Sequence, residues 1–162
     1  MLQDLRPYIV DLDHVAMAVH SVRAVLPLYR DLLGGEYYMG GVEAEQGYRW
    51  VQFRLPGGHK LEFLESLRDD SFVAKFLRLR GEGFHHITFH VHHLEELVQK
   101  LKERGMRIVG ENYQNPQWQE AFISPRQAHG TIIQLAQSCL TEEEGLQTWR
   151  PDLETLLGTP ED

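Results

Sequence analysis

The sequence predicts an α+β fold, in which two tandem βαβββ modules form a cleft-shaped sheet with a pseudo-twofold axis. Two observations lead to this prediction. The expected elements run β-α-β-β-β, then a linker helix, then β-α-β-β-β again. In addition, the first and last strands of the two halves resemble each other when the numbering is shifted by one constant offset, which is the pattern of an internal repeat.

The first module is expected over residues 9–66. Apolar and β-branched residues predict a first strand over 8–19. A helix over 21–33 should follow, because Ser21 is a suitable N-cap and Gly34 a suitable end. A short strand is expected over 35–41, and alternating polar and apolar residues predict two more strands, over 47–56 and 59–66.

The second module is expected over residues 84–137, after a linker helix over 69–80 with an acidic start and a basic end. Its predicted elements are a strand over 84–91, a helix over 93–105, and strands over 106–111, 118–125 and 130–137. Residues 1–137 should therefore form one domain made of two repeats. Residues 138–162 are expected to be a polar tail with a short helix within 149–158 and an irregular last four residues.

Composition and charge exclude several classes of function. The formal net charge of −8 argues against binding to nucleic acid, which requires a basic patch. No apolar run is long enough to cross a membrane. The N-terminus lacks a secretory signal pattern, and the chain has one cysteine, Cys139, so we expect a cytoplasmic protein.

The internal repeat brings four polar residues into equivalent positions. At an offset of 72 (86 − 14), DHVAMAVHSV (13–22) aligns with HHITFHVHHL (85–94), and GHKLEFLE (58–65) aligns with GTIIQLAQ (130–137). His14 then corresponds to His86, and Glu62 corresponds to Gln134. If a pseudo-twofold axis relates the modules, these four side chains converge. Two imidazoles, a carboxylate and an amide oxygen suit a divalent ion such as Zn, Ni, Co, Mn or Fe.

Each of the four residues also has a purely structural interpretation. A histidine on a strand is more often a hydrogen-bonded structural residue than a ligand. Residues 85–93 contain five histidines, of which only His86 is expected to bind the metal. Strand alternation places His85 on the opposite face, and His92 and His93 are expected at the surface or as helix caps.

Several segments resemble the vicinal oxygen chelate superfamily, which contains the glyoxalase, bleomycin-resistance and dioxygenase proteins. The segments are DHVAMAV, LYRDLLGG, VAKFLRLRGEGFHHITFHV and GTIIQLAQ, and the resemblance, strongest to methylmalonyl-CoA epimerase, runs from about residue 9 to 137. It implies the same fold and a metal bound by His14, Glu62, His86 and Gln134. The epimerases usually have glutamine at the first of the two end-strand positions and glutamate at the second, whereas here these two residues are interchanged.

The resemblance also locates the acid/base residue of the epimerases, a glutamate shortly after an EQG segment. That position is Trp50 in this sequence, and an indole cannot accept a proton at neutral pH. Glu62 is therefore the first candidate base and Glu120 the second. Glu120 shares a strand face with Phe122, which aligns with Trp50 at the offset of the repeat (122 − 50 = 72).

Four residues are candidates for substrate binding. Tyr48, Trp50 and Gln52 share one face of a predicted strand and could line a cleft, although core packing explains them equally well. His90 lies two residues beyond His86 on the same face, where it could contact the substrate or act as a base.

Three functions fit these observations. The first is a metal-dependent isomerase or lyase that stabilises an enolate of a small carbonyl or acyl-thioester substrate chelated to the metal. The second is an Fe(II)-dependent dioxygenase that uses His14, His86 and Glu62. The third is a non-catalytic protein of the bleomycin-resistance type that binds a small molecule. The resemblance further implies a homodimer.

Overall fold

The computed structural model describes residues 1–158, which divide into two compact units. One unit contains Met1–His14 and His85–Thr141, and we call it the β5 unit after its strand β5 (Gly83–Val91). The other contains Val15–Phe84 and the chain from Glu142 onward, and we call it the β4 unit after its strand β4 (Lys60–Ser66). The β5 unit therefore holds most of the second predicted repeat and the first residues of the chain up to His14, whereas the β4 unit holds the first repeat from Val15 onward.

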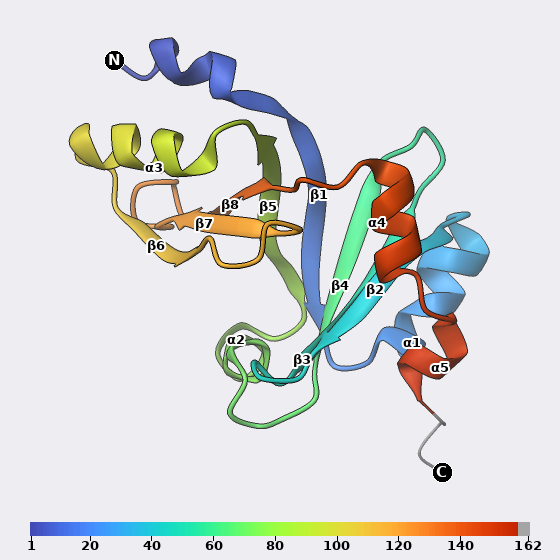
Figure 1. Ribbon diagram of the computed structural model, residues 1–162. Helices are drawn as coiled ribbons and strands as arrows, with labels where there is room; N and C mark the ends of the chain where they lie inside the picture. The colour runs from blue at the N-terminus through green and yellow to red at the C-terminus, as the bar shows by residue number, and fades with distance from the viewer. Residues whose placement is uncertain (159–162) are drawn as a thin grey trace. The chain divides into compact units, whose positions relative to one another are not determined.

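The β4 unit is built on strands β2 (Glu36–Glu43), β3 (Tyr48–Arg54), β4 and the second half of β1 (Ile9–Val19), in the order β2-β3-β4-β1 (Figure 1). The first half of β1, up to His14, belongs to the β5 unit. Strands β2, β3 and β4 are antiparallel, whereas β4 and β1 are parallel. The parallel pairing is possible because helical segments after β1 lead the chain back before the later strands form.

The β5 unit repeats this topology with strands β5, β8 (Ile132–Gln137), β7 (Gln119–Ile123) and β6 (Ile108–Asn112). Strands β5 and β8 are parallel, and β8, β7 and β6 are antiparallel. The strand order within this unit is β5-β8-β7-β6. The predicted α+β class and the two βαβββ modules are confirmed.

The strand registers confirm the internal repeat. Ala16 of β1 pairs with Glu62 of β4, and Thr88 of β5 pairs with Gln134 of β8. The two pairs are related by the predicted offset (88 − 16 = 72 and 134 − 62 = 72), as are the neighbouring pairs of these strands. The parallel strand pair of each repeat is therefore built in the same register.

The predicted helix after β1 is α-helical only in its first part. Ser21 caps helix α1 (Val22–Leu26) by accepting a hydrogen bond from the Ala24 amide. Pro27 has no amide hydrogen for the α-helical ladder, and from Pro27 the chain continues as a π-helical segment, η2 (Pro27–Leu32). The core under these segments contains Val19, Val22, Leu26, Val51, Phe53, Phe63 and Leu157.

Linker helix α2 (Phe72–Arg80) begins later than the predicted residue 69. Ser71 is its N-cap, because its hydroxyl accepts a hydrogen bond from the Ala74 amide at 3.0 Å. The two acidic residues before Ser71 therefore lie outside the helix, and the predicted acidic first turn was wrong. Val73 and Leu77 of α2 pack against Ala16, Ala18 and Leu64, which occupy one face of the β4-unit sheet.

In the β5 unit, helix α3 (Leu94–Glu103) packs on the sheet through its apolar stripe. Leu94, Leu97, Val98 and Leu101 join a core that includes Leu5, Val91, Ala121 and Leu135. Leu5 belongs to a 3₁₀ segment, η1 (Gln3–Tyr8), that the sequence did not predict. Within residues 1–158, no helix is long and apolar enough to cross a membrane.

Within the C-terminal tail, residues 142–158 belong to the β4 unit and pack beside β2 (Figure 1). The predicted short helix is α5 (Leu153–Leu157), and a second helix, α4 (Glu142–Trp149), was not predicted. The Glu142 carboxylate accepts hydrogen bonds from Arg54 and Tyr38, and these bonds lower the pKa of Glu142. The prediction for the last four residues lies outside the described part of the chain.

Replacement of Leu157 by alanine tests whether the tail is part of the core. Leu157 is 5% exposed within the core cluster, so Leu157→Ala should lower the free energy of unfolding by about 2–5 kcal/mol. Urea unfolding measures this loss. Leu32, which is 74% exposed, is the matched control, and Leu32→Ala should change stability by no more than about 0.5 kcal/mol. Equal effects of the two substitutions would contradict the packing.

Candidate functional site

Two buried histidines of the β5 unit form the centre of the candidate site. His14 comes from β1 and His86 from β5, and their exposed fractions are 1% and 5%. The ring centroids lie 5.6 Å apart in an edge-to-face arrangement, and each ring offers a ligand nitrogen within 4.8 Å of the other. Metal–imidazole bonds are about 2.0–2.1 Å long, so two nitrogens on one ion lie at most about 4.2 Å apart. The limit of 4.8 Å places this pair near that range.

His14 is oriented by contacts at both ring nitrogens. Its Nδ1 lies 2.6 Å from Oδ2 of Asp13, and its Nε2 lies 3.0 Å from Oγ1 of Thr88. A carboxylate that accepts the Nδ1 hydrogen makes Nε2 the ligand nitrogen, and this arrangement is common at metal-binding histidines. A metal bound there would replace the contact of Nε2 with Thr88. The donor set therefore fits a divalent metal.

His86 is oriented by its neighbour along the chain. The Nδ1 atoms of His85 and His86 lie 2.8 Å apart, so one ring donates to the other. Strand alternation alone would direct the two side chains to opposite faces. His85 is buried and has the structural position that was expected, while its contact with His86 was not predicted.

Gln134 connects the histidines to an acidic group. Its Oε1 accepts a hydrogen bond from Thr88 Oγ1 at 2.5 Å, and its Nε2 donates to Glu120 Oε2 at 2.6 Å. Trp118 Nε1 also donates to Glu120 Oε2, at 3.2 Å. Gln134 is buried, so these hydrogen bonds compensate for the lost contact of its amide with water.

The β4 unit holds another candidate ligand, Glu62, whose buried carboxylate is 7% exposed. Glu62 lies on β4 between Ala16 of β1 and Gln52 of β3. Gln52 Nε2 donates a hydrogen bond to Glu62 Oε2 at 2.8 Å. The carboxylate thus has a fixed orientation within its own unit.

The four residues predicted to bind substrate lie in four different surroundings. Tyr48 packs edge-on against Phe72 of α2, with the ring centroids 4.9 Å apart. Trp50 packs edge-on against Trp149 of α4, and Gln52 contacts Glu62. His90 is half-buried on β5, on the strand face that carries His86. Their role in binding stays a prediction.

The remaining histidines of residues 85–93 lie away from the buried pair. His92 and His93 are exposed, as predicted. His93 is the N-cap residue of α3 in a left-handed conformation, but its side chain makes no capping hydrogen bond. The first amide of the helix instead donates to Gln137 Oε1, at 2.7 Å.

One predicted equivalence between the two repeats was wrong. Trp50 and Phe122 align at the offset of 72 (122 − 50), but β3 and β7 do not follow this offset. Gln52 pairs with Glu62, and Phe122 pairs with Gln134, so Phe122 is equivalent to Gln52 at an offset of 70 (122 − 52). The connection before the last strand differs in length by two positions between the repeats, which makes Glu120 the equivalent of Trp50.

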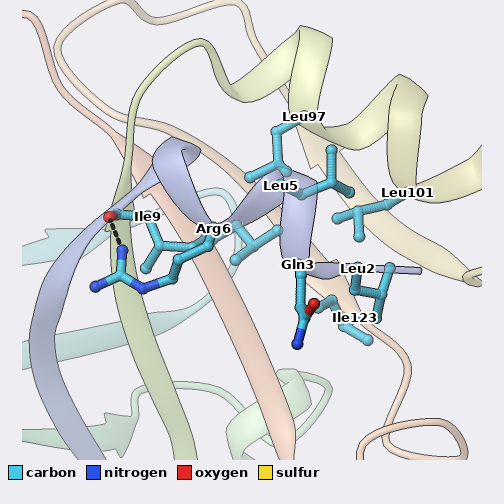
Figure 2. Close-up of a pocket in the computed structure, with 9 residues that line it drawn as sticks. Leu2, Gln3, Leu5, Arg6, Ile9, Leu97, Leu101 and Ile123 are labelled. Carbon is cyan, nitrogen blue, oxygen red and sulfur yellow. Dashed lines mark hydrogen bonds between the residues drawn. The ribbon is translucent and has the colours of Figure 1, made fainter.

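A pocket of about 610 Å³ lies elsewhere in the β5 unit. Figure 2 shows Leu5 of η1 and Leu97 and Leu101 of α3 at this pocket, with a hydrogen bond from Arg6 to the Ile9 carbonyl at its edge. Leu135 of β8 also lines the pocket. Because Leu135 and Gln134 are consecutive strand residues on opposite faces, the pocket is separate from the histidine pair.

Sequence reasoning missed three supporting residues of the site: Asp13, His85 and Thr88. A signal for Thr88 was present, since it lies two residues after His86 and therefore on the same strand face. Asp13 and His85 each precede a candidate ligand directly. Their contacts depend on side-chain torsions, which strand periodicity does not specify.

Comparisons with known proteins agree with this fold. The profile of the Glyoxalase/Bleomycin resistance protein/Dioxygenase superfamily matches residues 13–122. An uncharacterised Bacillus subtilis protein is 34% identical over 132 residues, covering 78% of this chain and 91% of the relative. An ethylmalonyl-CoA/methylmalonyl-CoA epimerase from Cereibacter sphaeroides is 31% identical over 133 residues, covering 78% and 96%. The crystal structure of methylmalonyl-CoA epimerase from Mycobacterium tuberculosis has a TM-score of 0.75 at 27% identity, covering 83% and 92%.

Thr88 should be essential to the buried hydrogen-bond network. Thr88→Val keeps the side-chain shape but removes the hydroxyl that contacts His14 and Gln134, so the free energy of unfolding should fall by about 1–3 kcal/mol. Thr88→Ser keeps the hydroxyl and is the matched control. Chemical denaturation of the metal-free proteins measures both. A Thr88→Val protein as stable as Thr88→Ser would contradict the network.

Proposed function

Because the chain belongs to the glyoxalase/bleomycin resistance protein/dioxygenase superfamily, we propose that it is a metal-dependent isomerase or lyase of the glyoxalase and methylmalonyl-CoA epimerase type. The observation that carries the proposal is the buried pair of His14 and His86, with His14 held by Asp13 and Thr88. A protein that only sequesters a small molecule needs no such pair.

The proposed metal ligands are His14, Glu62, His86 and Gln134. His14, His86 and Gln134 belong to the β5 unit. Thr88 contacts both His14 and Gln134 through its hydroxyl, and the rings of His14 and His86 pack edge to face. Glu62 is supported by the register of β1, which runs without interruption through His14 and then pairs Ala16 with Glu62. Imidazole, carboxylate and amide ligands suit Zn, Ni, Co, Mn or Fe.

A divalent ion bound there would act as a Lewis acid and stabilise negative charge on the substrate oxygens. The chain's own residues would position the substrate and move the proton. Glu62 and Glu120 are the candidate catalytic carboxylates. Tyr48, Trp50, Gln52 and His90 are the candidates for contact with the rest of the substrate, because they lie on the strand faces that carry the proposed ligands.

The proposed substrate is a small carbonyl compound or an acyl thioester. The name of the Cereibacter sphaeroides relative assigns two acyl-CoA substrates to that protein. This chain has Trp50 where the epimerases have an acid/base glutamate, so the proposal extends to other compounds with an acidic carbon–hydrogen bond beside a carbonyl group.

The His86→Ala protein should not retain a divalent metal. Wild-type protein is expected to bind about one ion per chain, and removal of one imidazole from a four-ligand set should weaken binding by at least about 10-fold to 100-fold. Elemental analysis after dialysis against Mn, Co, Ni or Zn measures this. His92→Ala removes an exposed histidine of the same segment and should bind metal normally. Equal metal content in the two variants would contradict the site.

The reaction class can be tested with the metal-loaded protein and two groups of compounds. Isomerase or lyase chemistry predicts turnover or proton exchange with a thioester such as methylmalonyl-CoA or with a 2-oxoaldehyde adduct, under anaerobic conditions. Oxygen uptake with a catechol would instead identify a dioxygenase. Tight binding by metal-free protein without turnover would identify a sequestering protein.

A further inference from the structure

Three strands of the β5 unit place one polar row beside the proposed metal ligands. His90 of β5 pairs with Ala136 of β8, and Ala136 pairs with Glu120 of β7. Residues that are paired across strands point to the same face of a sheet. The adjacent row contains Thr88, Gln134 and Phe122, so the polar row lies next to Gln134 on the same face.

The equivalent row of the β4 unit is apolar. Ala18 pairs with Leu64, and Leu64 pairs with Trp50. Ala18 and Leu64 are buried under Val73 and Leu77 of α2, and Trp50 packs beside them and against Trp149. The repeat has thus preserved the strand register in both units, but only the β5 unit carries groups in this row that can accept a proton.

We infer that Glu120 is the base that removes the proton from the carbon beside the substrate carbonyl, an inference that rests on the proposed function. The carbon–hydrogen bond breaks, the proton passes to Glu120, and the electron pair is delocalised into the carbonyl group. Return of the proton to carbon completes an isomerisation. No oxidant or reductant is consumed.

The position of Glu120 supports this role. It is half-buried, and its carboxylate is held by two donors, Gln134 Nε2 at 2.6 Å and Trp118 Nε1 at 3.2 Å. A carboxylate with a fixed orientation beside a proposed metal ligand is suited to act on a substrate that binds there. The small side chain of Ala136, between Glu120 and His90, keeps this part of the face from being filled by a large group.

The other candidate is less suited to the task. Glu62 is buried, accepts a hydrogen bond from Gln52 and is itself a proposed ligand. A carboxylate bound to a cation is a weaker base than one beside the cation, because the positive charge stabilises its ionised form. Glu120 is therefore better suited than Glu62 to accept the proton.

Glu120→Gln separates proton transfer from positioning. The amide oxygen can still accept hydrogen bonds from Gln134 and Trp118, but an amide cannot take up the proton. The probe is methylmalonyl-CoA in deuterated water with Co- or Mn-loaded protein, and deuterium incorporation is followed by mass spectrometry. Relative to wild type, the rate should fall by about 100-fold or more, with KM and metal content unchanged.

Two further variants complete the experiment. Glu120→Ala should be inactive and partly rescued by added formate, because a small carboxylate can occupy the space and accept the proton. Glu111→Gln changes an exposed carboxylate on β6 of the same unit and should exchange deuterium as wild type does.

The outcomes distinguish this inference from the proposed function. Full exchange by Glu120→Gln would overturn the assignment of the base and leave the reaction class intact. If Glu120→Gln loses both its bound metal and its deuterium exchange, Glu120 is a positioning residue, and its assignment as the base is also overturned. Wild-type protein that binds metal but exchanges no deuterium from methylmalonyl-CoA or from a 2-oxoaldehyde adduct would overturn both.

Discussion

The parallel pairing of the first and last strand of each repeat is the constraint on which the rest of the structure depends. Ala16 beside Glu62 and Thr88 beside Gln134 fix the register of both pairs. Because side chains alternate along a strand, a shift by one residue would turn each candidate ligand to the opposite face. The apolar contacts of α2 and α3 with the two sheets oppose such a shift, since it would expose Leu64 or Leu135.

Each unit pairs one carboxylate with one amide on neighbouring strands, but the two positions are exchanged between the units. In the β4 unit the carboxylate of Glu62 is on the last strand, and the amide of Gln52 donates to it from the neighbouring strand. In the β5 unit the amide of Gln134 is on the last strand, and the carboxylate of Glu120 is on the neighbouring strand. Each carboxylate therefore has an amide donor, which reduces the cost of burying its charge. An amide and a carboxylate have nearly the same shape, so such an exchange leaves the packing of the strands unchanged.

The sequence predicted the strands and the candidate ligands because both depend on local periodicity and on the repeat. The errors of prediction from the sequence have physical causes. The constant offset failed at Trp50 and Phe122 because the connection before the last strand is two residues shorter in the first repeat than in the second. A single sequence does not show at which position this difference in length occurs. Helix α4 was missed because its stability comes from contacts with residues distant in the chain, such as Tyr38 and Arg54. The contact between His85 and His86 depends on side-chain torsions, and periodicity alone places them on opposite faces.

The central claim is that two imidazoles and two oxygen-donating side chains bind the same cation. X-ray absorption spectroscopy of the Co- or Zn-loaded protein tests it most directly, because the outer-shell scattering of imidazole rings reports how many histidines bind the metal. The account predicts two imidazoles, with oxygen atoms as the remaining ligands and no sulfur. A spectrum that requires one imidazole or none, or a sulfur ligand, would contradict it.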